Sequence, residues 1–363
     1  MTGDYESSGV RGQGEALSSV ERRLGPTLEL PWGRLLTRFG HYATVIEIEP
    51  DARAMAVTTD GVGSKTLVAS AMDRYDTIGF DCVAMNVNDI LCVGARPYLL
   101  VDYLGVHTLD PRRTDEILQG LAAAAKEARI AIPGGELAQL PEVIGSDGKG
   151  PGDETAFDLV GTCVGFLHPK ELVLGHDVKP GDVLLGLHAS GIHSNGLTLA
   201  RRVLLKEGNF SLDGYVAELG CTVGEELLRP TRIYVEAIDL LWNEGIGTHG
   251  LVHVTGDGFA NLGRLEAAVG YRIDALPETP PIFRLIQEVG AIDDVEMYRV
   301  FNMGIGMVAI VSPDDETRAT SLLGQVGIDV TRLGEVEKKP GITIEPVNLV
   351  GEMTGGDSAF RKR

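Results

Sequence analysis

The sequence predicts an α+β protein built from two mixed α/β domains, and three observations support this. The chain has 363 residues, more than one hydrophobic core usually organises, so two domains are expected. Short apolar runs typical of strands recur along it, and most lead through a glycine-containing turn into a helical pattern. Proline and glycine in "HPKELVLGHDVKPGD" mark a new start near residue 170. We predict domains over 1–170 and 171–345, each a sheet with helices on one face rather than a doubly wound sheet.

The first domain is expected to alternate between strands and helices after a polar start. Residues 1–30 are polar and glycine-containing, which indicates a mobile arm. Strands are expected at 43–49 and 54–59, followed by a helical segment that ends at Gly94. Asp110-Pro111 opens an alanine-rich helix, because proline is favoured in the first turn. The remaining strands of this domain are "RPYLLVDYLGV", "AIPGGELAQL" and "AFDLVGTCVGFL".

The second domain repeats a plan of strand, glycine turn and helix. The strand "VLLGLHAS" leads through "GIHSNG" into a helix whose apolar positions recur at helical spacing. "LVHVTGDGFANLGRLEAA" has the same plan, and "PTRIYVEAIDLLWNEG" and "TRATSLLGQVG" are expected to be helices. "MYRVFNMGIGMVAIV" is expected to enter from a helix into an apolar strand. Residues 346–363 read as a disordered tail with a basic end.

Composition limits the classes of partner. The net charge of −20 disfavours nucleic acid, whose binding requires Lys and Arg to neutralise phosphates. A small phosphorylated ligand remains compatible if metal ions and backbone N–H groups cancel its charge locally. No apolar run reaches the roughly 20 residues needed to span a bilayer, and the N-terminus lacks the apolar core of a signal peptide. We therefore expect a cytoplasmic protein with no membrane partner.

Three carboxylates occupy positions suited to a metal site. Asp60 follows a strand in the turn of "TTDGVGSK", which does not have the spacing of a P-loop. Asp89 interrupts an apolar helix, and Glu136 follows Gly134 and Gly135 at another strand–turn junction. If the three converge, they form an oxygen-rich site suited to Mg²⁺. The alternative is that Asp60 and Glu136 cap turns while Asp89 lies at a solvent edge.

Two glycine turns are candidates for binding an anion. "SGIHSNG" and "TGDGF" each precede a helix, whose N-terminus offers free N–H groups and the positive end of its dipole. The alternative is ordinary turns, with Ser194 or Asn195 as N-caps. His193 lies inside the first turn and is the histidine with the stronger functional claim, whereas His253 could equally be a strand residue.

Six separated blocks together resemble one enzyme family. They are "TTDGVGSK", "IGFDCVAMNVNDILCVGARPYLLVDYLGV", "GGELAQLP", "LHASGIHSNGLTLARRVL", "HVTGDGF" and "EMYRVFNMGIGM". In this order they are similar to the phosphoribosylformylglycinamidine cyclo-ligases, the aminoimidazole ribonucleotide synthetases of purine biosynthesis, from about residue 57 to residue 311. The resemblance implies an ATP-dependent ring closure and a homodimer in which the N-terminal sheets pair into a barrel, with the ATP site near that interface.

The resemblance also implies roles for particular residues. Mg²⁺ would be held by Asp60, Asp89 and Glu136, and Lys65 would meet the nucleotide phosphates. Asp60, Lys65, Asp89 and His193 would be the catalytic group. The ATP site would comprise Thr59, Asp60, Gly61, Gly63, Lys65, Asp89, Gly134, Gly135 and Glu136. The substrate would be bound by His193, Ser194, Asn195, Gly196, Thr255 and Gly256.

The sequence departs from the family pattern in three places. The N-terminal arm is rewritten as "YESSGVRGQGEA", and "GGELAQLPE" stands where the family has "GGETAEMPG". Asp257 replaces a glycine beside the expected anion site, where an acid repels phosphate unless it points away or meets a cation. Two alternatives therefore stay open. One is a sister ATP-dependent enzyme such as thiamine-phosphate kinase, selenophosphate synthetase or the hydrogenase-maturation dehydratase, and the other is a non-catalytic nucleotide-binding paralogue.

Overall fold

The computed structural model describes residues 34–37, 41–49, 52–145, 152–351 and 360–363. The predicted mobile arm over 1–30 lies outside these residues. The described chain contains two large sheets, one built from strands before residue 168 and one from strands after residue 182. In this part of the chain, no helix is long and apolar enough to cross a membrane.

The first sheet has six strands in the order β1-β2-β3-β6-β4-β5. All neighbours are antiparallel except the parallel pair of β4 and β5. Side chains alternate between the two faces along each strand, so residues paired across strands share a face. The strands are β1 (Arg34–Leu35), β2 (Thr44–Glu49), β3 (Arg53–Gly61), β4 (Arg96–Val106), β5 (Gly135–Gln139) and β6 (Phe157–Leu167).

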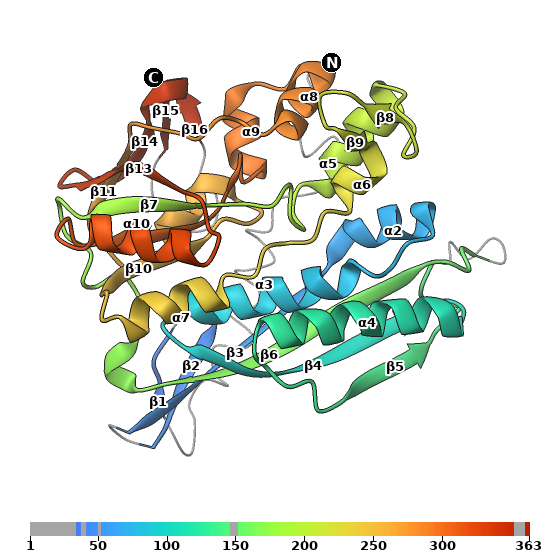
Figure 1. Cartoon of the computed structure of the whole chain (residues 1–363), viewed down its shortest axis with the longest axis horizontal. Helices are drawn as coiled ribbons and strands as arrows, with labels where there is room; N and C mark the ends of the chain where they lie inside the picture. The colour runs from blue at the N-terminus through green and yellow to red at the C-terminus, as the bar shows by residue number, and fades with distance from the viewer. Residues whose placement is uncertain (1–33, 38–40, 50–51, 146–151, 352–359) are drawn as a thin grey trace.

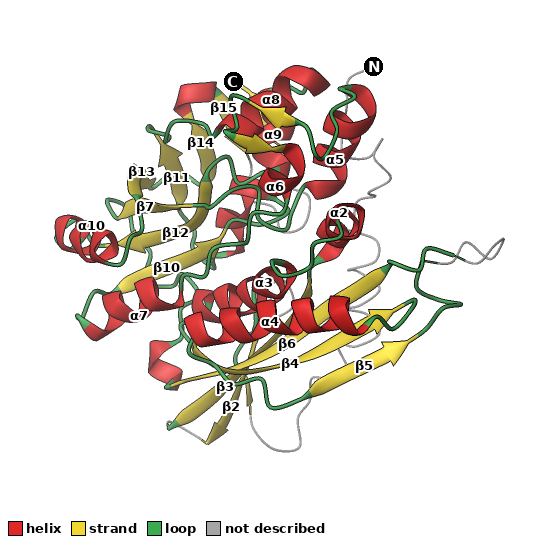
Figure 2. Ribbon diagram, turned by 45° about the vertical axis from the view of Figure 1, so that its right-hand side comes forward, coloured by secondary structure: helices red, strands yellow, loops and turns green. Residues whose placement is uncertain are grey.

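Among the described residues, helices cover one face of this sheet (Figure 2). The expected helical segment up to Gly94 is two helices, α2 (Thr66–Met72) and α3 (Ile78–Cys92), because Asp73 ends α2 in a left-handed conformation. The alanine-rich helix α4 (Pro111–Glu127) begins as predicted, with the Asp110 side chain accepting hydrogen bonds from two first-turn N–H groups.

The second sheet has eight strands in the order β10-β12-β7-β13-β11-β14-β15-β16. Both sheets are mixed and carry helices, which confirms the predicted α+β class. The strands are β7 (Val183–His188), β10 (Thr248–His253), β11 (Gly270–Ile273), β12 (Ile305–Val311), β13 (Val330–Glu337), β14 (Gly341–Ile344), β15 (Leu349–Gly351) and β16 (Phe360–Lys362). The α-helices of this half are α5 (Leu197–Arg201), α6 (Val223–Leu227), α7 (Val235–Asn243), α8 (Pro281–Gly290), α9 (Asp294–Val300) and α10 (Glu316–Gln325).

The prediction of a disordered tail is wrong for its described residues. β15 pairs with β14 and β16 pairs with β15, so the chain end completes the second sheet. Leu349 and Phe360 are buried there. Strands of three residues carry too weak a periodicity to be recognised in a sequence with several polar residues.

Helix α3 lies between the two sheets (Figure 1). Every residue of α3 except Phe80 is buried, which explains a sequence that is apolar on nearly all sides. Its buried polar side chains each need a partner. Asp81, Asn88 and Asp89 each have a partner in the second half of the chain, so α3 contributes polar contacts that join the two halves.

Candidate active site

Asp60 lies at the end of β3, on the face of the first sheet that α3 covers. Its Oδ1 accepts a hydrogen bond from the N–H of Gly61 at 2.8 Å, which turns the carboxylate towards the loop after the strand. The side-chain amide of Asn86 on α3 donates to the Asp60 carbonyl at 3.1 Å. Gly63 follows in the left-handed region, with φ +70° and open space where a side chain would begin. Open space therefore remains at position 63 of the loop that follows Asp60.

Asp89 faces Asp60 from α3 and is held by a histidine of the second half. His253 Nδ1 donates to Asp89 Oδ1 at 2.8 Å, and His253 is completely buried at the end of β10. Its Nε2 has no hydrogen-bond partner among the described residues. The alternative of Asp89 at a solvent edge is therefore wrong, because this residue is buried where α3 meets β10.

The two carboxylates influence each other. Burial and the negative charge of Asp89 raise the pKa of Asp60 to about 6, against the smaller effects of the Gly61 N–H, His253 and Arg264. Mutual repulsion between buried carboxylates is relieved when a cation binds between them. Asp60 and Asp89 therefore form a candidate cation site.

Loops of the second half close around this pair. Ser64 Oγ lies 2.9 Å from Thr198 Oγ1 at the start of α5, which joins the loop after Asp60 to the turn containing Asn195. A side chain at Gly256 would begin 3.3 Å from the Asn195 amide oxygen, so the two predicted substrate turns are neighbours. The N–H of Thr255 donates to Asn261, which fixes the second turn.

Asp257 is not an isolated acid beside these turns. Arg264 donates to its carboxylate at 3.3 Å, and the guanidinium of Arg264 also lies over the ring of Tyr42, 4.8 Å from its centre. A cation therefore balances the acid that replaces a family glycine. Arg264 was not singled out by the sequence, because nothing in the local pattern links it to a turn seven residues earlier.

Glu136 does not join Asp60 and Asp89 within one chain, and this corrects the predicted convergence. Asp60, Gly161, Asp102 and Gly135 form one row across four strands, whereas Glu136 pairs with Tyr103 in the next row. Side chains of adjacent rows project from opposite faces. Among the described residues, no three His, Cys, Asp or Glu side chains lie close enough to hold a metal.

The other ATP-site residues predicted from the same two blocks divide between the faces. Thr59 shares its row with Thr162 on the open face, and its hydroxyl donates to the Gly161 carbonyl. Gly134 has open space where a side chain would begin, whereas a side chain at Gly135 would collide with Asp102. Asp102 itself was missed by the sequence reasoning. It shares Asp60's row, and burial raises its pKa.

Lys65 is buried rather than directed at a ligand. Its Nζ donates to Asp81 Oδ1 at 2.8 Å and to the Arg229 carbonyl at 2.6 Å, and both side chains of the ion pair are fully buried. Asp81 also accepts from the N–H and hydroxyl of Thr231. These bonds connect the first half of the chain to the second. They leave the Lys65 ammonium no free path to nucleotide phosphates in this structure, so we reassign Lys65 from phosphate binding to domain docking.

His193 is also turned inward, contrary to the expectation that it faces the substrate. Its backbone has φ +66°, and its Nε2 accepts from the N–H groups of Ser190 (3.2 Å) and Arg232 (3.5 Å). Burial lowers the pKa of His193 well below its ordinary value, so the ring is neutral at pH 7. Its neighbour Ser194 lies 3.4 Å from the Thr231 hydroxyl. His193 therefore holds the turn in place through hydrogen bonds to the backbone of Ser190 and Arg232.

Gly306→Ala is expected to disturb this turn and lower the free energy of unfolding by about 1–3 kcal/mol. A side chain at Gly306 would begin 2.1 Å from the Tyr234 hydroxyl and 2.6 Å from His193 Cε1. Urea unfolding of both proteins tests this. Gly324→Ala in α10 is the control, because that position has open space and alanine favours a helix. Equal stability of Gly306→Ala and wild type would contradict the packing described here.

Comparison with known proteins identifies the family. The models described as AIR synthase related protein, N-terminal and C-terminal domains, match residues 40–167 and 179–346. The phosphoribosylformylglycinamidine cyclo-ligase of Methanothermobacter thermautotrophicus is 50% identical over 339 residues, 92% of this chain and 96% of that protein. The same enzyme of Methanobrevibacter smithii is 46% identical over 321 residues, 88% and 90% of the two chains.

A solved structure extends the likeness to the fold. Thiamine-monophosphate kinase from Stenotrophomonas maltophilia matches with a TM-score of 0.60 over 89% of this chain and 94% of that one, at 20% identity. At that identity the match concerns architecture alone, whereas the cyclo-ligase matches confirm the resemblance seen in the six blocks. The chain belongs to the phosphoribosylformylglycinamidine cyclo-ligase family.

Proposed function

We propose that the protein catalyses the ATP-dependent cyclisation of formylglycinamidine ribonucleotide to aminoimidazole ribonucleotide in purine biosynthesis. The observation that carries this proposal is 50% identity to a cyclo-ligase across nearly the whole of both chains. The carboxylate pair at the domain junction is consistent with it, because Asp60 and Asp89 lie where loops of both halves meet. A cytoplasmic location remains a prediction from the sequence.

The reaction has two steps. The amide oxygen of the substrate attacks the γ-phosphorus of ATP, and ADP leaves. The neighbouring nitrogen then attacks the activated carbon, phosphate leaves, and loss of a proton completes the imidazole ring. Positioning and neutralisation of charge account for most catalysis of phosphoryl transfer. In our proposal Asp60 and Asp89 orient the nucleotide end, while Asn195, Gly196, Thr255 and Gly256 position the ribonucleotide.

Mg²⁺ fits the carboxylate pair. Mg²⁺ usually binds through one or two carboxylates together with phosphate oxygens and water, so Asp60 and Asp89 suffice on the protein side. The raised pKa of Asp60 indicates negative charge that a cation would stabilise. When bound, Mg²⁺ would neutralise charge on the phosphates. His253 would keep Asp89 oriented, and the glycines at 61 and 63 would give the phosphates access to the loop backbone.

We also propose a homodimer through the open face of the first sheet. Val101 and Tyr103 project from this face and are 39% and 37% exposed, and Phe166 and Tyr98 make an aromatic contact beside them. An apolar sheet face without covering helices is typical of an interface. Glu136 lies on the same face. Glu136, Thr59, Gly134 and Gly135 stay predicted ATP-site residues.

Val101→Asp is expected to convert the dimer into monomers, because each interface would bury two uncompensated carboxylates. Light scattering after size-exclusion chromatography gives the molar mass directly. Leu118→Asp is the matched control, since Leu118 is 49% exposed on the outer side of α4. A wild type that is monomeric, or a Val101→Asp protein that remains dimeric, would contradict this interface.

The proposed activity is tested by ADP release from purified protein with Mg-ATP, with and without formylglycinamidine ribonucleotide. The expected result is substrate-dependent ADP release with an equal amount of aminoimidazole ribonucleotide. ATP binding without substrate-dependent turnover would contradict the proposal and favour the non-catalytic alternative. ADP release that does not depend on formylglycinamidine ribonucleotide but requires another phosphate acceptor would favour a sister enzyme.

A further inference from the structure

A cleft lies next to the His193 turn, and it is lined in part by Ser190 and Arg232, whose N–H groups bond to His193. Its volume is about 400 Å³, within the range of sites for small molecules. Phe80 at the start of α3 and Glu127 at the end of α4 line it from the first half of the chain. The second half contributes Ser190, residues 229–233, Glu236, Ala237 and residues 326–328. None of the residues assigned above to ATP or substrate belongs to this lining.

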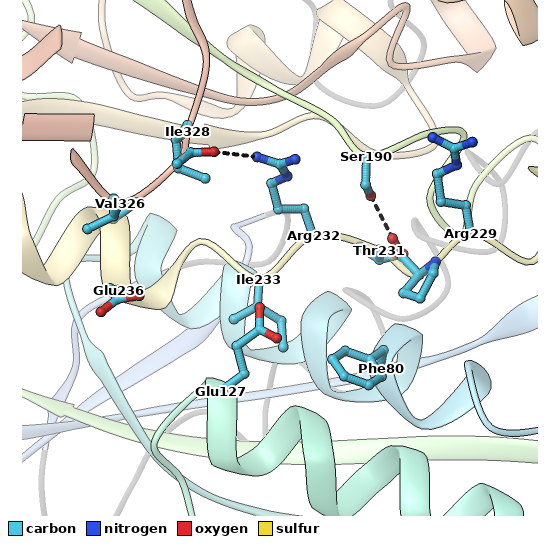
Figure 3. Close-up of a pocket in the computed structure, with 13 residues that line it drawn as sticks. Phe80, Glu127, Ser190, Arg229, Thr231, Arg232, Ile233, Glu236, Val326 and Ile328 are labelled. Atoms are coloured by element: carbon cyan, nitrogen blue, oxygen red, sulfur yellow. Dashed lines mark hydrogen bonds between the residues drawn. The ribbon is translucent and has the colours of Figure 1, made fainter. Parts of the chain in front are cut away.

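One side of the cleft carries two arginines. Arg232 makes a 3.4 Å hydrogen bond to the Gly327 carbonyl, and no carboxylate pairs with it among the described residues. Arg229 pairs with Glu226, which occupies part of its guanidinium. Figure 3 shows the two arginines on the same side of the cleft, with Ser190 between them. Two carboxylates, Glu127 and Glu236, also line the cleft, and Glu236 pairs with Arg129, which is not part of the lining. In a chain with a net charge of −20, two guanidinium groups on one side of a cleft favour an anionic ligand. Phosphate monoesters match the fork of an arginine with two parallel hydrogen bonds.

The opposite side offers an aromatic ring and an acceptor. Phe80 is the one residue of α3 that is not buried, and its ring lies across the cleft from the arginines, with Glu127 also on that side (Figure 3). An aromatic face stacks with a nucleobase. A carboxylate accepts hydrogen bonds from the amino or hydroxyl groups of a nucleoside. Glu127, like Arg232, takes part in no ion pair among the described residues.

We propose that this cleft is a second ligand site, which binds a ribonucleoside monophosphate. The phosphate would lie against Arg229 and Arg232, the base against Phe80, and Glu127 would accept from the base or the ribose. An amino acid or other small zwitterion would pair with one arginine and would have no base to stack on the Phe80 ring. The nucleotide therefore accounts for more of the lining.

The cleft is connected to the active site through the His193 turn. The backbone N–H groups of Ser190 and Arg232, which both line the cleft, donate to His193 Nε2. The Ser190 hydroxyl donates to the Pro230 carbonyl at 2.6 Å, so these two lining segments move together. A nucleotide that binds the Arg232 side chain and displaces its backbone would shift His193, and with it the neighbouring Asn195 and Gly196. The site is therefore placed to regulate substrate binding.

The test is titration calorimetry with AMP while a non-hydrolysable ATP analogue saturates the ATP site. Wild type is expected to bind one AMP per chain under these conditions. Arg232→Gln is expected to weaken AMP at least roughly tenfold, because it loses a charge-assisted bidentate contact. Arg284→Gln is the matched control, since Arg284 is an exposed arginine outside the cleft that pairs with Glu278. Phe80→Leu is expected to weaken AMP while leaving the affinity for inorganic phosphate unchanged.

The outcomes separate this site from the proposed activity. Titration of the ATP analogue alone shows whether the ATP site exists, independently of AMP. AMP binding that disappears when the analogue is present, or that survives both Arg232→Gln and Phe80→Leu, would overturn the second site. Loss of AMP binding in Arg232→Gln with unchanged binding of the analogue would support it, since a misfolded variant would lose both.

Discussion

Asp60→Asn is expected to abolish ring closure while making the free protein more stable at neutral pH. Loss of activity follows because the variant removes one of the two carboxylates proposed to hold Mg²⁺, and we expect a fall in turnover of roughly a thousandfold. The gain in stability follows because ionised Asp60 is unfavourable in the folded state, where its pKa is about 6 instead of 3.8. Function and stability should therefore change in opposite directions.

The sign of the pH dependence follows from the raised pKa. An aspartate with a pKa of about 6 when folded and 3.8 when unfolded costs nothing at low pH and destabilises as pH rises from 4 to 6. Above pH 7 the full cost is about 3 kcal/mol as an upper value, because the pKa is about 6 in the folded state and 3.8 in the unfolded state. Asparagine mimics the neutral acid, so the variant should escape this cost.

Urea unfolding at pH 4.5 and pH 8 in the presence of a chelator measures the effect. With the chelator, the free energies of unfolding of wild type and Asp60→Asn should differ little at pH 4.5 and clearly at pH 8. When Mg²⁺ replaces the chelator, it should stabilise wild type alone. Asp314→Asn, in the turn after β12, is the control, because Asp314 is an exposed carboxylate. An Asp60→Asn protein that retains ring closure, or that is less stable than wild type at pH 8, would contradict this role.

Lys65→Met is expected to lower the free energy of unfolding by about 3–5 kcal/mol, because it leaves the Asp81 carboxylate buried without its counter-charge. Lys65→Met with Asp81→Leu should recover part of the loss by removing both charges. Recovery should be incomplete, since Thr231 then loses the acceptor for its N–H and hydroxyl.

Two measurements distinguish this role from phosphate binding. If Lys65 docks the domains, unfolding in urea shifts strongly, and the double variant lies between wild type and Lys65→Met. If Lys65 instead contacts ATP, the KM for ATP rises while the urea midpoint stays near that of wild type. The second pattern would restore the assignment made from the sequence.

The sequence was most informative where buried polarity interrupts an apolar pattern. Asp89 could be singled out because a carboxylate within an otherwise apolar helix requires a partner, and the structure supplies His253. The capped helix at Pro111 was equally predictable, since Asp110 and proline are local signals. Local capping signals and the apolar pattern of the buried helix therefore made these parts of the fold predictable from the sequence.

The failures concern contacts that depend on register and on distant partners. Whether Glu136 shares a face with Asp60 is decided by pairing across β6 and β4, and a shift of one residue reverses the face. Lys65 follows the site loop directly, but its partner Asp81 lies 16 residues further on and its second acceptor 164 residues away. A sequence motif shows which residues are neighbours along the chain, but it does not determine the direction in which side chains such as Lys65 and Glu136 project.

The most direct test of the central claim is the position of the metal. A crystal of the protein with Mn²⁺ in place of Mg²⁺ and a non-hydrolysable ATP analogue, recorded near the manganese absorption edge, locates the ion by its anomalous scattering. If Asp60 and Asp89 hold the metal, an anomalous peak is expected within bonding distance of both carboxylates, with the analogue's phosphates on its other side. A peak bound to Glu136 and to neither aspartate would contradict this expectation.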